Sequence, residues 1–104
     1  MKWIEMIHLR SYSQPDRDDA LAAFQQLTVS DQQSDLQDIT LLRHITLEND
    51  LCIFIHWEGE GPGRGKSPLG LQLSAAFSEF GQINHSAWAQ EASVPAERKE
   101  DNLS

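Results

Sequence analysis

Residues 51–58 read LCIFIHWE, and the glycine-rich stretch GEGPGRGK follows directly over residues 59–66. The first stretch is rich in β-branched and aromatic residues, so it predicts a strand, whereas the second can only form a loop. Alternate residues of a strand face opposite sides of a sheet. One set here is Leu51, Ile53, Ile55 and Trp57, and the other is Cys52, Phe54 and His56. Both sets are largely apolar, which predicts a sheet that needs cover on both faces.

The sequence on either side of this strand completes a βαββαβ order. Turn signals, helix starts and apolar periodicity predict strands over 3–12, 39–47 and 83–91 and helices over 16–28 and 67–80. Asp16 is the expected cap of the first helix, and Gly81 the expected end of the second. Since crossovers are right-handed and the middle pair is a hairpin, the order predicts an α+β, ferredoxin-like fold. Its four-stranded antiparallel sheet would have the order 4-1-3-2, with both helices on one face.

Length and charge limit the classes of protein to which the chain can belong. Its 104 residues predict a single domain over residues 1–91, followed by a charged, flexible tail over 92–104. Sixteen acidic residues against eight basic ones leave a formal charge of −8, which argues against nucleic-acid and anionic-membrane partners. With Cys52 as its single cysteine, the chain can form neither an internal disulfide nor a cysteine-based zinc site. No signal-peptide or membrane-spanning pattern occurs, so we expect a cytoplasmic protein.

The second apolar face of the sheet predicts a partner. Two helices can cover only one face, and an identical chain is the simplest cover for the other. We therefore expect a homodimer that forms through the sheet. The alternative is that the second face is of mixed character, as in many small monomers.

Two short patterns carry a family resemblance. Residues 53–57, IFIHW, lead into the second helix, and residues 85–88, HSAW, lie in the last strand. With the element order, these resemble the dimeric α/β-barrel superfamily, in particular its antibiotic-biosynthesis-monooxygenase-like domains. The resemblance implies a dimeric α/β barrel with a pocket between sheet and helices. It also implies a function among cofactor-free oxygenases, haem-degrading enzymes, isomerases and proteins without an assigned activity. Haem-degrading relatives carry a histidine on the second helix, and residues 67–80 contain none, so no cofactor is expected.

The loop from Gly59 to Lys66 looks like a phosphate-binding loop but lacks its spacing. A P-loop needs a glycine five residues before the glycine that precedes its lysine, and Glu60 stands there. The loop is better interpreted as a lid or a spacer.

Histidine is the most unusual feature of the chain, with one in each predicted strand: His8, His44, His56 and His85. A two-residue turn at Asn49-Asp50 would pair His44 with Ile55 and His56 with Arg43, and so place these two histidines on opposite faces. In the predicted sheet, His8 or Arg10 could approach His85. A two-histidine metal site with Glu5 or Glu58 is conceivable, but separate hydrogen-bonded histidines are favoured and no metal is predicted.

The candidate site residues follow from these placements. His8 and His56 are the candidate acid–base catalysts. The candidate ligand-binding residues are Arg10, Tyr12, Trp57, His85 and Trp88. Together they predict a cofactor-independent oxygenase or isomerase-like enzyme for a small aromatic or anionic molecule. The alternatives are a non-catalytic ligand-binding or regulatory domain and a metal protein. For the tryptophans, packing in the core or at an interface is the safer assignment.

Overall fold

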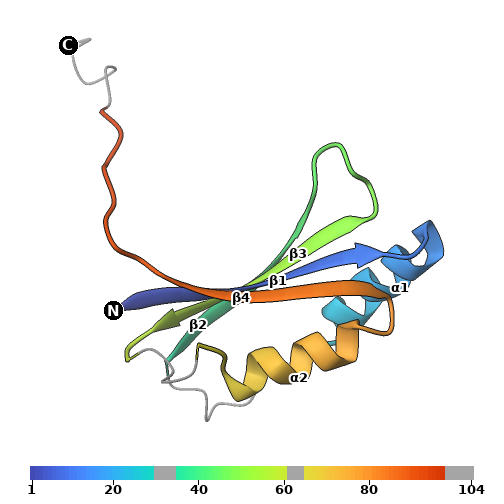
Figure 1. The fold of residues 1–104 in the computed structure, drawn as a ribbon, viewed down its shortest axis with the longest axis horizontal. Coiled ribbons are helices and arrows are strands. Elements are labelled where there is room, and N and C mark those ends of the chain that lie inside the picture. The colour runs from blue at the N-terminus through green and yellow to red at the C-terminus, as the bar shows by residue number, and fades with distance from the viewer. Residues whose placement is uncertain (30–34, 61–64, 98–104) are drawn as a thin grey trace.

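A computed structural model describes residues 1–29, 35–60 and 65–97 (Figure 1). The elements in chain order are β1 Lys2–Ser11, α1 Gln14–Gln25, β2 Leu36–Arg43, β3 Asp50–Glu58, α2 Pro68–Phe77 and β4 Gly81–Ala89. The predicted βαββαβ order is therefore confirmed. All six expected elements are present, although several ends move by two to four residues.

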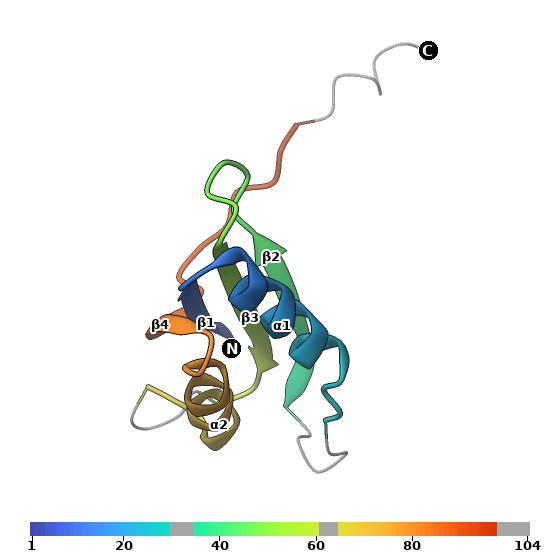
Figure 2. The same cartoon turned by 90° about the vertical axis from the view of Figure 1, so that its right-hand side faces the viewer.

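All four strands form one antiparallel sheet in the order β2-β3-β1-β4, which is the predicted order read from the other edge. Both helices lie on the same side of this sheet (Figure 2). We call the side under the helices the core face and the opposite side the outer face. On β1 the core face carries Trp3, Glu5, Ile7 and Leu9, and the outer face carries Ile4, Met6, His8 and Arg10.

The core lies between the sheet and the two helices. It is built from Trp3, Ile7, Leu9, Ala20, Leu51, Ile53, Ile55, Trp57, Leu73 and Phe77. The alternation predicted for residues 51–58 is confirmed, because the odd-numbered residues of β3 are buried and the even-numbered ones from 52 on face outward. Trp3 and Trp57 stack with ring centroids 5.2 Å apart; both indoles belong to the core and also line a cavity at this end of the sheet.

The helix ends differ from the expectations at two positions. Ser13, not Asp16, caps α1, and its hydroxyl oxygen accepts the backbone N–H of Asp16. Gly81 does not end α2 in a left-handed conformation, because α2 ends at Phe77 and Gly81 begins β4. A Cβ on Gly81 would collide with the carbonyl oxygen of Arg10, so the close approach of β4 to β1 explains this glycine.

The hairpin between β2 and β3 is longer than predicted, and this changes the register. β2 ends at Arg43 rather than Leu47, so residues 44–49 form the connection and His44 lies in that loop. Thr40 pairs with Phe54 and Asp38 with His56, instead of His44 with Ile55 and Arg43 with His56. The physical reason is local: the His44 ring Nδ1 accepts the backbone N–H groups of Thr46 and Leu47, which stabilises a wider turn than Asn49-Asp50 alone.

Several expectations concern segments that the structure describes only in part. Residues 61–64 of the loop from Gly59 to Lys66 and residues 98–104 of the tail lie outside the described residues. Residues 90–97 leave the sheet without regular secondary structure and are exposed. Within the described ranges, neither helix is long and apolar enough to cross a membrane. The domain boundary at residue 91 and the cytoplasmic location stay predictions.

Candidate functional site

A histidine, an arginine and an aspartate converge at one end of the outer face. His8 and Arg10 project from β1, and the register pairs Arg10 with Asp50 at the start of β3. Asp50 Oδ2 lies 3.0 Å from His8 Nε2 and 3.6 Å from the Arg10 guanidinium. The Asp50 side chain is only 8% exposed, whereas that of His8 is 39% exposed. A buried carboxylate thus holds one ring nitrogen of a histidine whose ring stays open to solvent.

Two cavities border this cluster. One, of about 420 Å³, is lined by His8 and Asp50 together with apolar groups such as Met6, Leu42 and Ile45. The other, of about 340 Å³, lies across His8 and Arg10 beside Gln82, Ile83 and Asn84. Cys52 pairs directly with His8 across the strands and lines the first cavity. Burial raises the pKa of the Cys52 thiol, which makes it a poor nucleophile at neutral pH.

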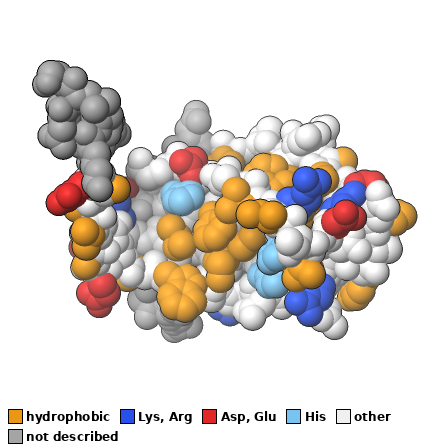
Figure 3. All heavy atoms as spheres, turned by 90° about the horizontal axis from the view of Figure 1, so that it is seen from above, with side chains coloured by type: hydrophobic (Ala, Val, Ile, Leu, Met, Phe, Trp, Pro, Cys, Tyr) orange, Lys and Arg blue, Asp and Glu red, His pale blue; other side chains and the backbone are white. Residues whose placement is uncertain are grey.

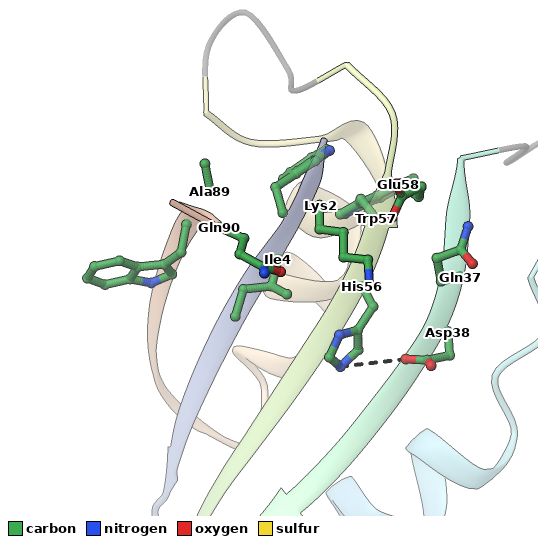
Figure 4. Close-up of a pocket in the computed structure, with 11 residues that line it drawn as sticks. Lys2, Ile4, Gln37, Asp38, His56, Trp57, Glu58, Ala89 and Gln90 are labelled. Carbon is green, nitrogen blue, oxygen red and sulfur yellow. Dashed lines mark ion pairs between the residues drawn. The ribbon is translucent and has the colours of Figure 1, made fainter. Parts of the chain in front are cut away.

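A further cavity, of about 480 Å³, occupies the opposite end of the outer face (Figure 4). Lys2, His56, Asp38 and Glu58 supply its charged groups, and Trp88, which is 58% exposed, is its most open aromatic group. His56 Nε2 lies 3.6 Å from Asp38 Oδ1, which is an ion-pair distance too long for a hydrogen bond. Both side chains are well exposed, so Asp38 orients His56 less firmly than Asp50 orients His8.

A fully buried carboxylate lies on the core face. Glu5 accepts hydrogen bonds from the Ser67 backbone N–H at 2.5 Å, the Ser67 hydroxyl at 2.6 Å and the Trp57 indole N–H at 3.3 Å. Ser67 caps α2, so the carboxylate lies at the positive end of that helix. A Cβ on Gly70 would lie 2.6 Å from Glu5 Oε2, which explains the glycine in the first turn. Glu5 therefore joins the sheet to the start of α2.

The candidate residues separate into three places. His8 and Arg10 lie at one end of the outer face, and His56 and Trp88 at the other. His85 lies on the core face, opposite Ile7, so the expected approach of His8 or Arg10 to His85 is wrong. Tyr12 follows the end of β1 and is 66% exposed. Within the described ranges, no three His, Cys, Asp or Glu side chains gather closely enough to hold a metal ion.

The sequence alone predicts no role for Asp50 at the site and no hydrogen-bonded network around Glu5. The expected hairpin makes Asp50 only a turn residue, because it places this position between the strands. The sequence carries no local signal for its role, which depends on the register that brings Asp50 opposite Arg10. For Glu5 the sequence suggests only a conceivable metal ligand. A lone acid between Ile4 and Met6 in a buried strand also indicates a group that needs buried donors.

His85 gives the fold a pH dependence that can be measured. Burial lowers the pKa of His85, and the charge of Glu5, whose Oε1 lies 3.4 Å from Nε2, offsets this only in part. Because the pKa is lower in the folded chain, the unfolded chain binds the extra proton as pH falls below about 6.5. The free energy of unfolding should therefore decrease from pH 7.5 to pH 5.5. Urea unfolding of the wild type and His85→Gln tests this; an equally steep pH dependence in the variant would contradict it.

Comparisons with known proteins support the fold and leave the site open. No protein-family model and no curated protein matches the sequence. Among solved structures, a dimeric ferredoxin-like protein from an uncultured marine organism has a TM-score of 0.67 at 10% identity, covering 92% of this chain and 93% of that one. A variant of SnoaB, a cofactor-independent oxygenase from Streptomyces nogalater, has a TM-score of 0.60 at 15% identity, covering 91% and 98%. A second structure of SnoaB gives 0.57 at the same identity and coverage. These likenesses confirm the ferredoxin-like fold that the order of the elements predicted.

Proposed function

We propose that this ferredoxin-like chain is a cofactor-independent oxygenase or isomerase-like enzyme for a small aromatic or anionic molecule, and that it works as a homodimer. The observation that carries the proposal is the 3.0 Å contact between His8 and the buried Asp50 beside a largely apolar cavity. A histidine held in this way is suited to act as a general base. The structural likeness to SnoaB, named as a cofactor-independent oxygenase, supports the choice of reaction class.

The chemistry requires the removal of one proton. His8 takes a proton from an acidic O–H or C–H group of the substrate, and Asp50 stabilises the imidazolium that forms. Arg10, which is exposed and lines the cavity of about 340 Å³ on the other side of His8, binds the anion that the substrate becomes. Proton removal to a stabilised anion is the step that cofactor-free oxygenation and isomerisation share. The apolar lining from Met6, Leu42 and Ile45 favours a ligand with an aromatic or aliphatic body.

The homodimer follows from the outer face. Ile4, Met6, Phe54 and Trp88 supply apolar surface on the side that the helices leave open, and hydrophobic side chains gather over it (Figure 3). A second copy placed there would also exclude water from His8, which strengthens its interaction with Asp50. The neighbour from the marine organism, which is named as dimeric, supports this assembly.

The direct test is turnover without any added cofactor. A panel of hydroquinones, naphthols and small keto acids is incubated with the purified chain, and oxygen uptake and proton NMR report oxygenation and isomerisation. Turnover of at least one compound supports the proposal. Saturable binding without turnover would replace it with the non-catalytic ligand-binding function, and neither binding nor turnover would reject both.

Replacing Asp50 by asparagine should slow the reaction through His8. The amide would keep the shape of the side chain but remove the charge that stabilises the imidazolium. A hydrogen bond to a charged group contributes roughly 1.5–3 kcal/mol, so Asp50→Asn should lower kcat by roughly tenfold to hundredfold. KM should change little, since Asp50 is buried and positions His8 rather than the substrate. Steady-state kinetics of Asp50→Asn measure this effect. The control is Glu79→Gln, a change at an exposed residue just beyond α2. Equal kcat in the two variants would contradict the prediction.

A further inference from the structure

The connection between β2 and β3 is an ordered, apolar projection. We call residues 44–49 the arm; it rises from the sheet on the side away from both helices (Figure 1). Two backbone N–H groups of the arm bind His44 Nδ1, and the buried Arg17 guanidinium donates to the Glu48 carbonyl at 3.1 Å. Within the arm, Ile45 is 98% exposed. The arm is thus held in place while its most exposed apolar side chain faces water.

A single exposed apolar residue is common on protein surfaces, but the surroundings of Ile45 call for an explanation. Ile45 forms one wall of the cavity beside His8, and Leu42 and Leu47 beside it are also half exposed. The arm stands over the outer face, which is the surface we propose for self-association. Any copy of the chain that packs on this face must meet the arm.

The size of the sheet suggests that the arm adds to the contact. The strands have 8 to 10 residues. Four strands of about nine residues, at roughly 3.3 Å per residue and 4.8 Å between strands, make a face of about 570 Å². Two such faces bury roughly 1,100 Å², just below the roughly 1,200–2,000 Å² of a stable specific interface. Contacts made by two arms would bring the interface into that range.

A two-fold axis that stacks two outer faces on each other must lie parallel to both sheets, and its angle to the strands decides where the two arms lie. A two-fold axis along the strands places both arms at the same end, where two projections from facing surfaces would hold the sheets apart. An axis inclined to the strands places each arm at the other end of its partner and over the opposite edge, because β2 and β4 are the two edge strands of the sheet. That end carries the cavity of about 480 Å³, whose apolar lining includes Ile4, Trp88 and Ala89 (Figure 4).

We propose that the arm of each copy seats in this cavity of a second copy, with Ile45 against Trp88 of the partner subunit. The inference rests on the proposed homodimer and specifies how its two copies meet. By the same two-fold axis, the indole of Trp88 of the partner subunit comes over the cavity beside His8. Each site is then completed by the other copy, and an isolated copy has an open site.

Cross-linking tests the placement of the arm. In a Cys52→Ser background, Ile45→Cys, Ala89→Cys and the double variant are treated with a short bismaleimide and separated under denaturing conditions. Within one copy Arg43, two residues before Ile45, is level with Leu9, and Ala89 is level with Trp3. The two positions therefore lie more than six residues apart along the strands, over roughly 20 Å, which is beyond the reach of the reagent. We expect covalent dimers from the double variant and none from either single variant. Dimers from Ile45→Cys alone would show that the arms meet each other and would overturn the proposal.

Sedimentation separates a wrong placement from a wrong assembly. If the wild type sediments as a monomer at all concentrations, both the homodimer and the arm contact are rejected. If it sediments as a dimer but the double variant does not cross-link, only the arm contact is rejected. Ile45→Glu should raise the dimer dissociation constant at least tenfold, and Val94→Glu, a change at a similarly exposed apolar residue of the tail, should not. Equal dissociation constants for the two variants would contradict the proposal.

Discussion

His8→Gln is expected to lower kcat/KM by about 10²–10⁴-fold, the usual contribution of a positioned general base. Glutamine approximates the size of histidine and can still donate to Asp50, so the change removes the proton acceptor while keeping the 3.0 Å contact possible. The measurement is steady-state oxygen uptake, or proton NMR for isomerisation, on the compound of the panel that the wild type turns over best.

Chemical rescue distinguishes a lost base from a disturbed site. In His8→Ala, added imidazole can enter from the two cavities that border this position and replace the missing ring. We expect imidazole to restore part of the activity of His8→Ala and to leave Glu79→Gln unchanged. Turnover by His8→Gln at the wild-type rate would refute His8 as the base and would direct attention to His56, the other candidate, at the far end of the outer face.

Glu5→Ala is expected to be the most destabilising of these single changes. It would leave Ser67 N–H, the Ser67 hydroxyl and the Trp57 indole N–H buried without an acceptor. It would also leave a cavity where the carboxylate was. Breaking a buried charged network of this kind costs about 3–5 kcal/mol, against a total stability of roughly 5–15 kcal/mol for a single domain. Urea unfolding followed by tryptophan fluorescence measures the loss.

Two further variants show whether the carboxylate or merely the side-chain volume matters. Glu5→Gln keeps an acceptor and most of the volume, so it should lose less stability than Glu5→Ala. Gly70→Ala leaves Glu5 in the sequence but places a Cβ 2.6 Å from its Oε2, so it should also destabilise the fold. Glu79→Gln, at an exposed acid near the same helix, is the matched control. A Glu5→Ala chain as stable as this control would show that the network contributes little.

The candidate site and the implied family pocket lie on different faces of the sheet. The resemblance implied a pocket between sheet and helices, but that space holds the core and the Glu5 network. The half-exposed histidines with cavities beside them, His8 and His56, lie on the outer face. A site on this face is enclosed only when another copy covers it, so assembly and activity should be lost together in Ile45→Glu.

Local pattern predicts most of the fold. The alternation in residues 51–58, the helix start at Ser67-Pro68 and the order of the elements lead to the observed topology, because each depends on neighbours in the sequence. The errors fall at element ends. The apolar run around His44 predicts a strand there, but the His44 side chain caps a turn and so ends the strand early. Gly81 has the pattern of a helix end, whereas its closeness to Arg10 depends on the pairing of β4 with β1.

The candidate site likewise has features that follow from local sequence and features that arise only on folding. The alternation of side chains in a strand is enough to place His8 and Arg10 on one face, since it has a period of two residues. The contact of both with Asp50 arises only on folding, because it spans 42 residues and depends on the register of β1 with β3. Folding also places His85 and Glu5 under the helices, away from His8. Register is a property of paired strands, and a one-residue shift would have moved each of these side chains to the other face.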